Sequence, residues 1–116
     1  MFKLDQGNTY WFPVTVEMTD AEGRKRKFDF DAEFERIPQD EINDFFRKRE
    51  EGEEPLKDAD LIERVFRGWR RVQDAEGRDV PVTPENRAAL LNVFPVSPSI
   101  ARAWLKSIGI EGKAKN

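Results

Sequence analysis

The sequence predicts an α+β domain: an N-terminal antiparallel β-hairpin or small sheet, followed by about four α-helices with a short second hairpin. Three observations support this fold class. Apolar and polar residues alternate through two stretches that flank residues 20–23, as expected for strands with one packed face. Helical spacing of apolar residues replaces this alternation after residue 36. The turn-forming sequence Asp-Ala-Glu-Gly occurs at residues 20–23 and again at 74–77.

The first hairpin has a strongly specified register. The apolar residues on its packed face occupy even positions: Tyr10, Phe12, Val14, Val16 and Met18, then Phe28, Phe30, Ala32 and Phe34. Pairing Val16 with Phe28 and Val14 with Phe30 keeps both sets on the same face. A slip of one residue would move one whole set to the opposite face, so this register is expected.

Two helices are expected next. Helical spacing predicts the first over residues 37–49, with Phe45 and Phe46 on its apolar side and its end before Gly52. Asp58 is expected to cap a second helix, whose apolar positions continue through Phe66 to Trp69. Gly68 would break that helix near its end.

The C-terminal part is expected to hold the second hairpin and two further helices. The hairpin turns at residues 74–77, and Pro81 confines its second strand to an edge or a bulge. Thr83 and Pro84 form a cap and first helical position for one helix, and Ser97 is expected to cap the other. Residues 1–110 would form a single domain, with a flexible tail at 111–116.

Composition narrows the function. The chain has 116 residues, a net charge of -3, and neither histidine nor cysteine. The commonest general base, imidazole metal ligands and thiolate chemistry are therefore excluded. An acidic balance gives no overall attraction to nucleic acids or anionic membranes. No apolar stretch approaches the length of a membrane span. A protein without enzymatic activity, cofactor or metal is expected.

Clusters of charged residues suggest two other functions, a cation or acid–base site and a nucleic-acid-binding surface. Asp29, Asp31 and Glu33 share the polar face of the second strand and could attract a hard cation or act as an acid–base pair. A solvated face that protects an exposed strand is the favoured interpretation. Residues 24–27 and the arginines around Trp69 suggest a nucleic-acid surface, but neighbouring acidic residues dilute both patches.

Aromatic residues give the better signal for binding another protein. The chain has nine phenylalanines and three tryptophans, residue types enriched at protein interfaces as well as in cores. For each aromatic residue, a position in the core or in a lid over the core is favoured over a position in an interface. The candidate partner-binding residues are Trp11, Pro13, Phe66, Trp69, Phe94 and Trp104.

A set of short segments, taken in order, carries a family resemblance. They are residues 9–16 (TYWFPVTV), 28–36 (FDFDAEFER), Gly68-Trp69, residues 77–82 (GRDVPV), 83–86 (TPEN), Leu90-Leu91, 94–96 (FPV) and the Lys115-Asn116 terminus. With this order and spacing, the sequence resembles the tail assembly chaperones of tailed bacteriophages and prophages over most of its length. One departure is Pro38, where a Ser or Thr cap would be expected.

The resemblance implies a non-enzymatic helper of tail morphogenesis in the bacterial host cytoplasm. Such a protein binds and solubilises the tape measure protein, helps to recruit tail tube subunits and is absent from the mature virion. The family resemblance also implies that this chain is the short form, and that a form extended by programmed frameshifting contacts the tail tube protein. Weak self-association is expected. The alternatives are a structural or connector subunit of the phage tail, then a nucleic-acid-binding regulator, then an enzyme.

Overall fold

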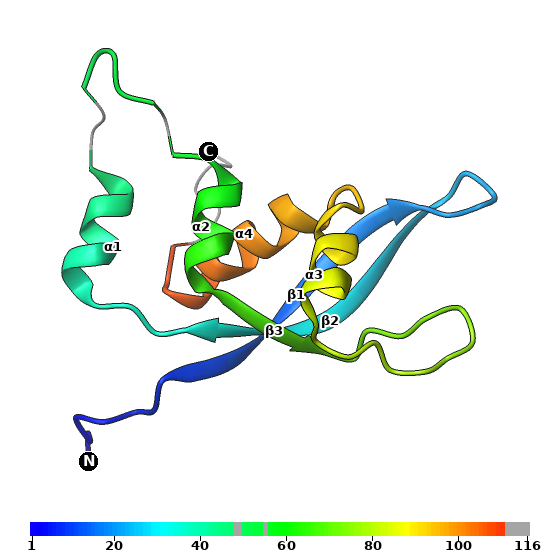
Figure 1. Cartoon of the computed structure of the whole chain (residues 1–116), viewed down its shortest axis with the longest axis horizontal. Helices are drawn as coiled ribbons and strands as arrows, with labels where there is room; N and C mark the ends of the chain where they lie inside the picture. The colour runs from blue at the N-terminus through cyan, green and yellow to red at the C-terminus, as the bar shows by residue number, and fades with distance from the viewer. Residues whose placement is uncertain (48–49, 55, 111–116) are drawn as a thin grey trace.

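The α+β fold class is confirmed by the computed structural model, which describes residues 1–47, 50–54 and 56–110 (Figure 1). The elements in chain order are β1 (Thr9–Thr19), β2 (Lys25–Glu35), α1 (Gln39–Phe46), α2 (Asp58–Val65), β3 (Phe66–Arg70), α3 (Pro84–Leu91) and α4 (Val96–Ser107). The predicted tail at 111–116 lies outside the described residues.

The three strands form one antiparallel sheet in the order β1-β2-β3. The predicted hairpin register is confirmed, because Val14 pairs with Phe30 and Val16 pairs with Phe28. β1 is an edge strand, which accommodates Pro13 without loss of a hydrogen bond inside the sheet. β2 is the central strand and β3 lies along its other side.

The predicted continuation of the second helix to Trp69 is wrong. α2 ends at Val65, and the next five residues form β3 against β2. A β-bulge interrupts the register between Glu33 and Phe34, so that Phe34 pairs with Phe66 and Ala32 with Trp69. The extra residue in β3 places Phe66 and Trp69 on the same face although they are three positions apart. Residues three positions apart also lie on the same face of a helix. The spacing of Phe66 and Trp69 therefore fits a helix as well as a bulged strand.

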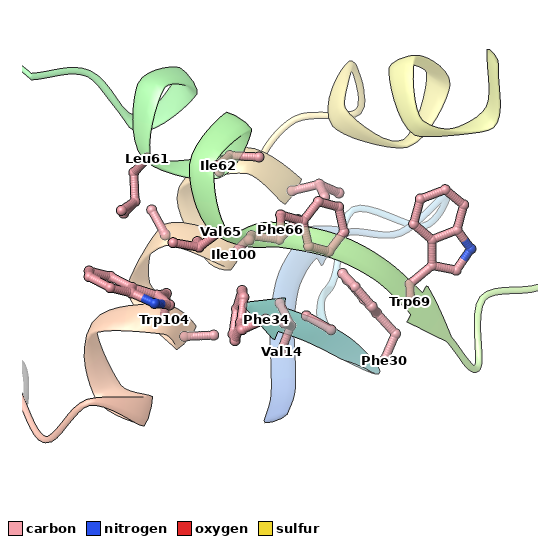
Figure 2. Packing of buried hydrophobic residues seen from close by; sticks show 14 of the residues in the cluster. Val14, Phe30, Phe34, Leu61, Ile62, Val65, Phe66, Trp69, Ile100 and Trp104 are labelled. Carbon is pink, nitrogen blue, oxygen red and sulfur yellow. The ribbon is translucent and has the colours of Figure 1, made fainter. Parts of the chain in front are cut away.

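The core lies between one face of the sheet and the helices α2 and α4 (Figure 2). Its largest fully buried side chains are Trp104, Phe34, Phe66, Ile100, Val14 and Val65. The ring of Phe34 lies at the centre, 5.9 Å from the ring of Tyr10 and 6.5 Å from that of Phe66. The hydroxyl of Tyr10 lies 2.7 Å from that of Ser107, which fixes the end of α4 against β1.

Of the three N-cap residues predicted from the sequence, one is confirmed and two are wrong. The Thr83 side chain accepts a hydrogen bond from the backbone N–H of Asn86, as predicted. Lys57, not Asp58, precedes α2, and the Asp60 carboxylate accepts from the Lys57 backbone N–H instead. α4 begins one residue before Ser97, whose hydroxyl donates to the carbonyl of Leu91. α1 begins at Gln39 and not at residue 37, because Pro38, the residue before α1, is extended. It ends at Phe46, and residues 48–49 of the predicted 37–49 lie outside the described residues.

The two Asp-Ala-Glu-Gly-Arg sequences fold into the same loop. In each, the aspartate carboxylate accepts 2.9 Å hydrogen bonds from the backbone N–H groups two and four residues later. The glycine has a positive φ of 84° at Gly23 and 81° at Gly77, and its N–H donates to the aspartate carbonyl at 3.0 Å. The first loop joins the long strands β1 and β2. The second closes only an isolated bridge between Gln73 and Asp79, so the predicted second hairpin is much shorter than the first.

Candidate partner-binding surfaces

The six candidate partner-binding residues are divided between the surface and the core. Trp11 is 39% exposed, Phe94 is 82% exposed and Pro13 is also exposed. Phe66, Trp69 and Trp104 are buried, with exposed fractions of 0%, 4% and 1%. These three residues are corrected from candidate surface residues to core residues.

Each of the buried aromatic residues has a structural role. Phe66 and Trp69 stack with their ring centroids 6.1 Å apart. The indole N–H of Trp69 donates to the carbonyl of Val80 at 2.9 Å, which ties the second hairpin to β3. Trp104 meets Phe45 of α1 edge to face, at 5.8 Å between centroids. A partner cannot reach these rings in this conformation.

Trp11 lies on the face of the sheet opposite the core, beneath an arginine. The Arg70 guanidinium carbon lies 4.2 Å from the Trp11 ring centroid, within the range of a cation–π interaction. Arg70 and Arg71 both donate to the carboxylate of Asp31, at 3.1 Å and 3.0 Å from their Nε atoms. Arg71 adopts a positive φ of 69°, a left-handed conformation that is uncommon for a residue other than glycine and coincides with the end of β3.

The acidic residues of β2 are structural. Asp29 and Glu33 accept hydrogen bonds from the hydroxyl groups of Thr15 and Thr9 on β1, at 3.0 Å and 2.7 Å. Glu35 pairs with Arg64 and Arg67, as Asp31 does with Arg70 and Arg71. The face is solvent-accessible, as predicted, but the expectation that it protects an exposed strand is wrong, because β2 is the central strand and its carboxylates bind its neighbours. No cluster of metal-ligating residues occurs within the described parts of the chain.

The arginines predicted around Trp69 are all ion-paired. Arg64 binds the carboxylates of Glu41 and Glu35, and Arg67 binds Glu35. Arg24 and Arg26 of the first hairpin tip share Asp20. These carboxylates offset much of the positive charge that a phosphate backbone would need.

Ion pairing at Asp31 predicts a loss of stability in acid. Hydrogen bonds from Arg71, and then from Arg70, lower the pKa of the Asp31 carboxyl below its ordinary value of 3.8. A lowered pKa in the folded state stabilises the protein above the unfolded pKa, and this stabilisation is lost as the pH falls through the folded value. Asp31→Asn should therefore reduce the difference between the urea midpoints measured at pH 7 and pH 3.

The matched control for this experiment is Glu22→Gln, which removes one negative charge from the tip of the first hairpin. It should leave the wild-type difference between the two urea midpoints in place. If Asp31→Asn retains the full wild-type difference, the Asp31–arginine contacts do not contribute to the pH dependence.

Phe94 belongs to an apolar patch at the far end of the first hairpin, beyond the part of the sheet that the helices cover. We call this the hairpin-end patch. It comprises Met18, Phe94 and Pro95, which line one groove, with Phe28 on the same face of the sheet as Met18 and Val93 next to Phe94 in the chain. Phe28 is 51% exposed and Val93 is 42% exposed. Met18, Phe94 and Pro95 line an open groove of about 430 Å³ together with Glu17, Thr19 and Lys25.

Sequence reasoning did not find Phe28 as a surface residue. Its position in the alternating pattern predicted a packed side chain, and it does lie on the core face of the sheet, opposite Val16. The core residues next along that face, Phe30 and Val16, are buried, whereas Phe28 is not. The pattern identifies the face of a residue but not how far the covering helices extend.

A second exposed apolar region lies beside α1, where Phe46 is 48% exposed and Leu56 is 38% exposed. α1 and α3 have no buried residues, in contrast to α2 and α4. Both helices therefore lie on the periphery of the domain. Within the described residues, no helix is long and apolar enough to cross a membrane.

The surfaces that this structure offers to a partner are thus the face around Trp11, the hairpin-end patch and the region beside α1. Comparison of the chain with protein-family models, with curated proteins and with solved structures found no match.

Proposed function

We propose that this protein is a tail assembly chaperone, which binds and solubilises a tape measure protein and has no enzymatic activity. The observation that carries the proposal is the grouping of exposed large apolar side chains at the hairpin-end patch and beside α1, on a small, highly charged domain. These side chains include Phe28, Phe46, Leu56, Val93 and Phe94. Contiguous exposed apolar side chains are typical of sites that bind other proteins.

The proposed mechanism is reversible covering of apolar surface on the client. Several copies bind along one client chain, and each contributes a small contact through the hairpin-end patch. Many weak contacts hold a complex together while each remains easy to displace. Tail tube subunits, recruited through a frameshift-extended form of the chain, then replace the chaperone, which does not remain in the virion.

The ionisable groups agree with a binding role. Among the described residues, the carboxyl groups with shifted pKa values are Asp20, Asp31, Glu35 and Asp74, and each pKa is lowered. The causes are hydrogen bonds from backbone N–H groups or arginines. Such shifts keep the carboxylates ionised and serve structure, whereas a general acid at neutral pH needs a raised pKa.

Co-expression with the tape measure protein of the same phage or prophage tests this proposal. The chain should increase the soluble yield of the tape measure protein and elute with it in size exclusion. Phe94→Ser combined with Phe28→Ser should lower that yield several-fold, because both changes remove apolar surface from the hairpin-end patch. Soluble yield is measured by quantitative gel analysis of cleared lysates.

The matched control is Val82→Ser, at a residue that is 52% exposed but lies outside the patch. It should leave the yield unchanged. An unchanged yield with the wild-type chain, and no joint elution, would reject the chaperone proposal. Recovery of the chain as a stoichiometric component of purified virions would instead favour a connector subunit.

A further inference from the structure

α1 is an amphipathic helix that lies on the domain without becoming part of its core. None of its eight residues is buried. Its apolar side chains Ile42, Phe45 and Phe46 lie on one side, and only Ile42 and Phe45 pack against the core cluster. Figure 1 shows α1 at one end of the molecule, set apart from the other helices.

Two hollows flank α1, and most of the residues that line them are apolar. A hollow of about 470 Å³ on one side of the helix is lined by Tyr10, Phe12, Glu35, Arg36, Ile37, Ile42, Trp104, Ser107 and Ile108. A second hollow of about 160 Å³ is lined by Phe45, Phe46, Leu56, Lys57, Asp58, Leu61, Trp104 and Leu105. Trp104 contributes to both hollows and contacts Phe45 between them. We call the two hollows, together with the face of Trp104 that Phe45 covers between them, the Trp104 trough.

Within the described parts of the chain, Arg64 makes the side-chain hydrogen bonds between α1 and the trough. Arg64 of α2 donates through Nη2 to Oε1 of Glu41 at 2.8 Å, and its Nε also contacts the second oxygen of Glu41. The same guanidinium binds Glu35 through Nη1 at 3.1 Å. Arg64 is thus held by the sheet, through Glu35, in a position where it can bind a carboxylate on whichever helix occupies the trough.

We propose that α1 is a displaceable lid, and that the Trp104 trough binds an amphipathic helix of a partner protein in its place. α1 itself indicates the chemistry of this occupant: two apolar residues three positions apart, with an acidic residue one position before the first, as Glu41, Ile42 and Phe45 are arranged. The absence of buried residues in α1 makes its removal inexpensive compared with removal of α2 or α4. The identification of the partner as the tape measure protein rests on the proposed function; the lid itself does not.

The lid can be locked chemically because the chain has no cysteine. Phe46 and Lys57 line the same 160 Å³ hollow from α1 and from the residue before α2. The double variant Phe46→Cys, Lys57→Cys can be joined by a short bis-maleimide linker, which pins α1 in place. The same variant capped with a monofunctional maleimide is the matched control, with α1 free to leave. Both forms retain Trp104, Phe45 and Arg64.

The probe is a fluorescein-labelled, helix-stapled peptide with the sequence of residues 37–47. The capped form should bind it roughly tenfold or more tightly than the linked form, because a pinned α1 competes at high effective concentration. Glu41→Gln in the otherwise unmodified protein should raise affinity for the probe several-fold above wild type, because the lid loses its contact with Arg64. If Glu41 instead contacted the probe directly, the same substitution would lower the affinity of the protein for the probe. Affinity is measured by fluorescence anisotropy.

Several results would contradict the proposal that α1 is a displaceable lid. Equal affinity of the linked and capped forms would do so, as would equal binding of a control peptide with Ile42→Ser and Phe45→Ser. A stable dimer of the capped form, without peptide binding, would show that the occupant is α1 of a second copy. If the linked form solubilises the tape measure protein as well as the capped form does, the tape measure protein is not the occupant of the trough, while the proposed function, which acts through the hairpin-end patch, stands. If peptide binding follows the expectation but no tape measure complex forms, the proposed function alone fails.

Discussion

Trp104→Ala is expected to lower the free energy of unfolding by about 3–5 kcal/mol, the usual cost of truncating a large buried aromatic side chain. Trp104 is 1% exposed, contacts Phe45 edge to face and lines both hollows of the Trp104 trough. Domains of this size are stabilised by roughly 5–15 kcal/mol in total. The variant should therefore unfold at a much lower urea concentration than the wild type, as measured by circular dichroism.

Trp11→Ala is the matched control, since it removes the same side chain from the opposite face of the sheet. Trp11 is 39% exposed and its main partner is the exposed guanidinium of Arg70. The expected loss is about 1 kcal/mol or less, typical of an exposed cation–π pair. Similar losses for the two variants would contradict the placement of Trp104 in the core. From the sequence alone, both tryptophans are candidate partner-binding residues, and the structure separates them.

Arg87→Ala is expected to cost about 2–3 kcal/mol, because it leaves backbone carbonyl groups without their charged donor. Arg87 extends from α3 to the junction of α2 and β3. Its Nη1 donates to the carbonyl of Phe66 at 2.7 Å and its Nη2 to the carbonyl of Ile62 at 3.3 Å. Its guanidinium carbon also lies 5.0 Å from the Phe66 ring centroid. Because α3 buries no residue, this one side chain is a principal attachment of the helix.

Arg87→Lys should recover only part of the loss, because an ammonium group lacks the planar fork that reaches two carbonyls while stacking on a ring. Burial lowers the pKa of Arg87, but an arginine remains charged at neutral pH. Arg102→Ala, at an exposed position of α4, is the control and should change stability little. Full recovery by lysine, or an equal loss at Arg102, would contradict this role. Urea unfolding of the three variants gives the comparison.

The first hairpin could be predicted in detail because the residues that determine its register are close together in the sequence. Alternation gives the face of each residue, the turn sequence gives the connection, and together they leave one register. The same reasoning found the cap at Thr83, where the cap, Pro84 and the first acidic residue are adjacent in the chain. Each of these features is decided within a few residues.

β3 could not be predicted because its strand conformation depends on a partner far away in the sequence. Phe66 and Trp69 fit the apolar side of a helix that starts at Asp58, and only the free side of β2 and the bulge at Glu33 make a strand preferable. Tertiary pairing thus overrides a local pattern. The role of Arg87 was missed for a similar reason, since its carbonyl partners are 21 and 25 residues away.

The candidate surface was only partly predictable. The sequence identifies aromatic residues, but it does not show which of them the helices will cover. Trp11, Pro13 and Phe94 are exposed whereas Phe66, Trp69 and Trp104 are not. Coverage depends on where α2 and α4 end over the sheet. The trough beneath α1 also depends on this arrangement, since its walls come from both ends of the chain and from α2.

The loops at 20–24 and 74–78 show how small a self-sufficient structural unit can be. One closes a ladder of eleven residue pairs and the other a single bridge, yet the hydrogen bonds that their backbone N–H groups donate within the loop match to within 0.1 Å. The pentapeptide therefore dictates its own shape irrespective of what it connects. Grafted in place of an unrelated two-strand connection in another protein, it should carry its geometry with it.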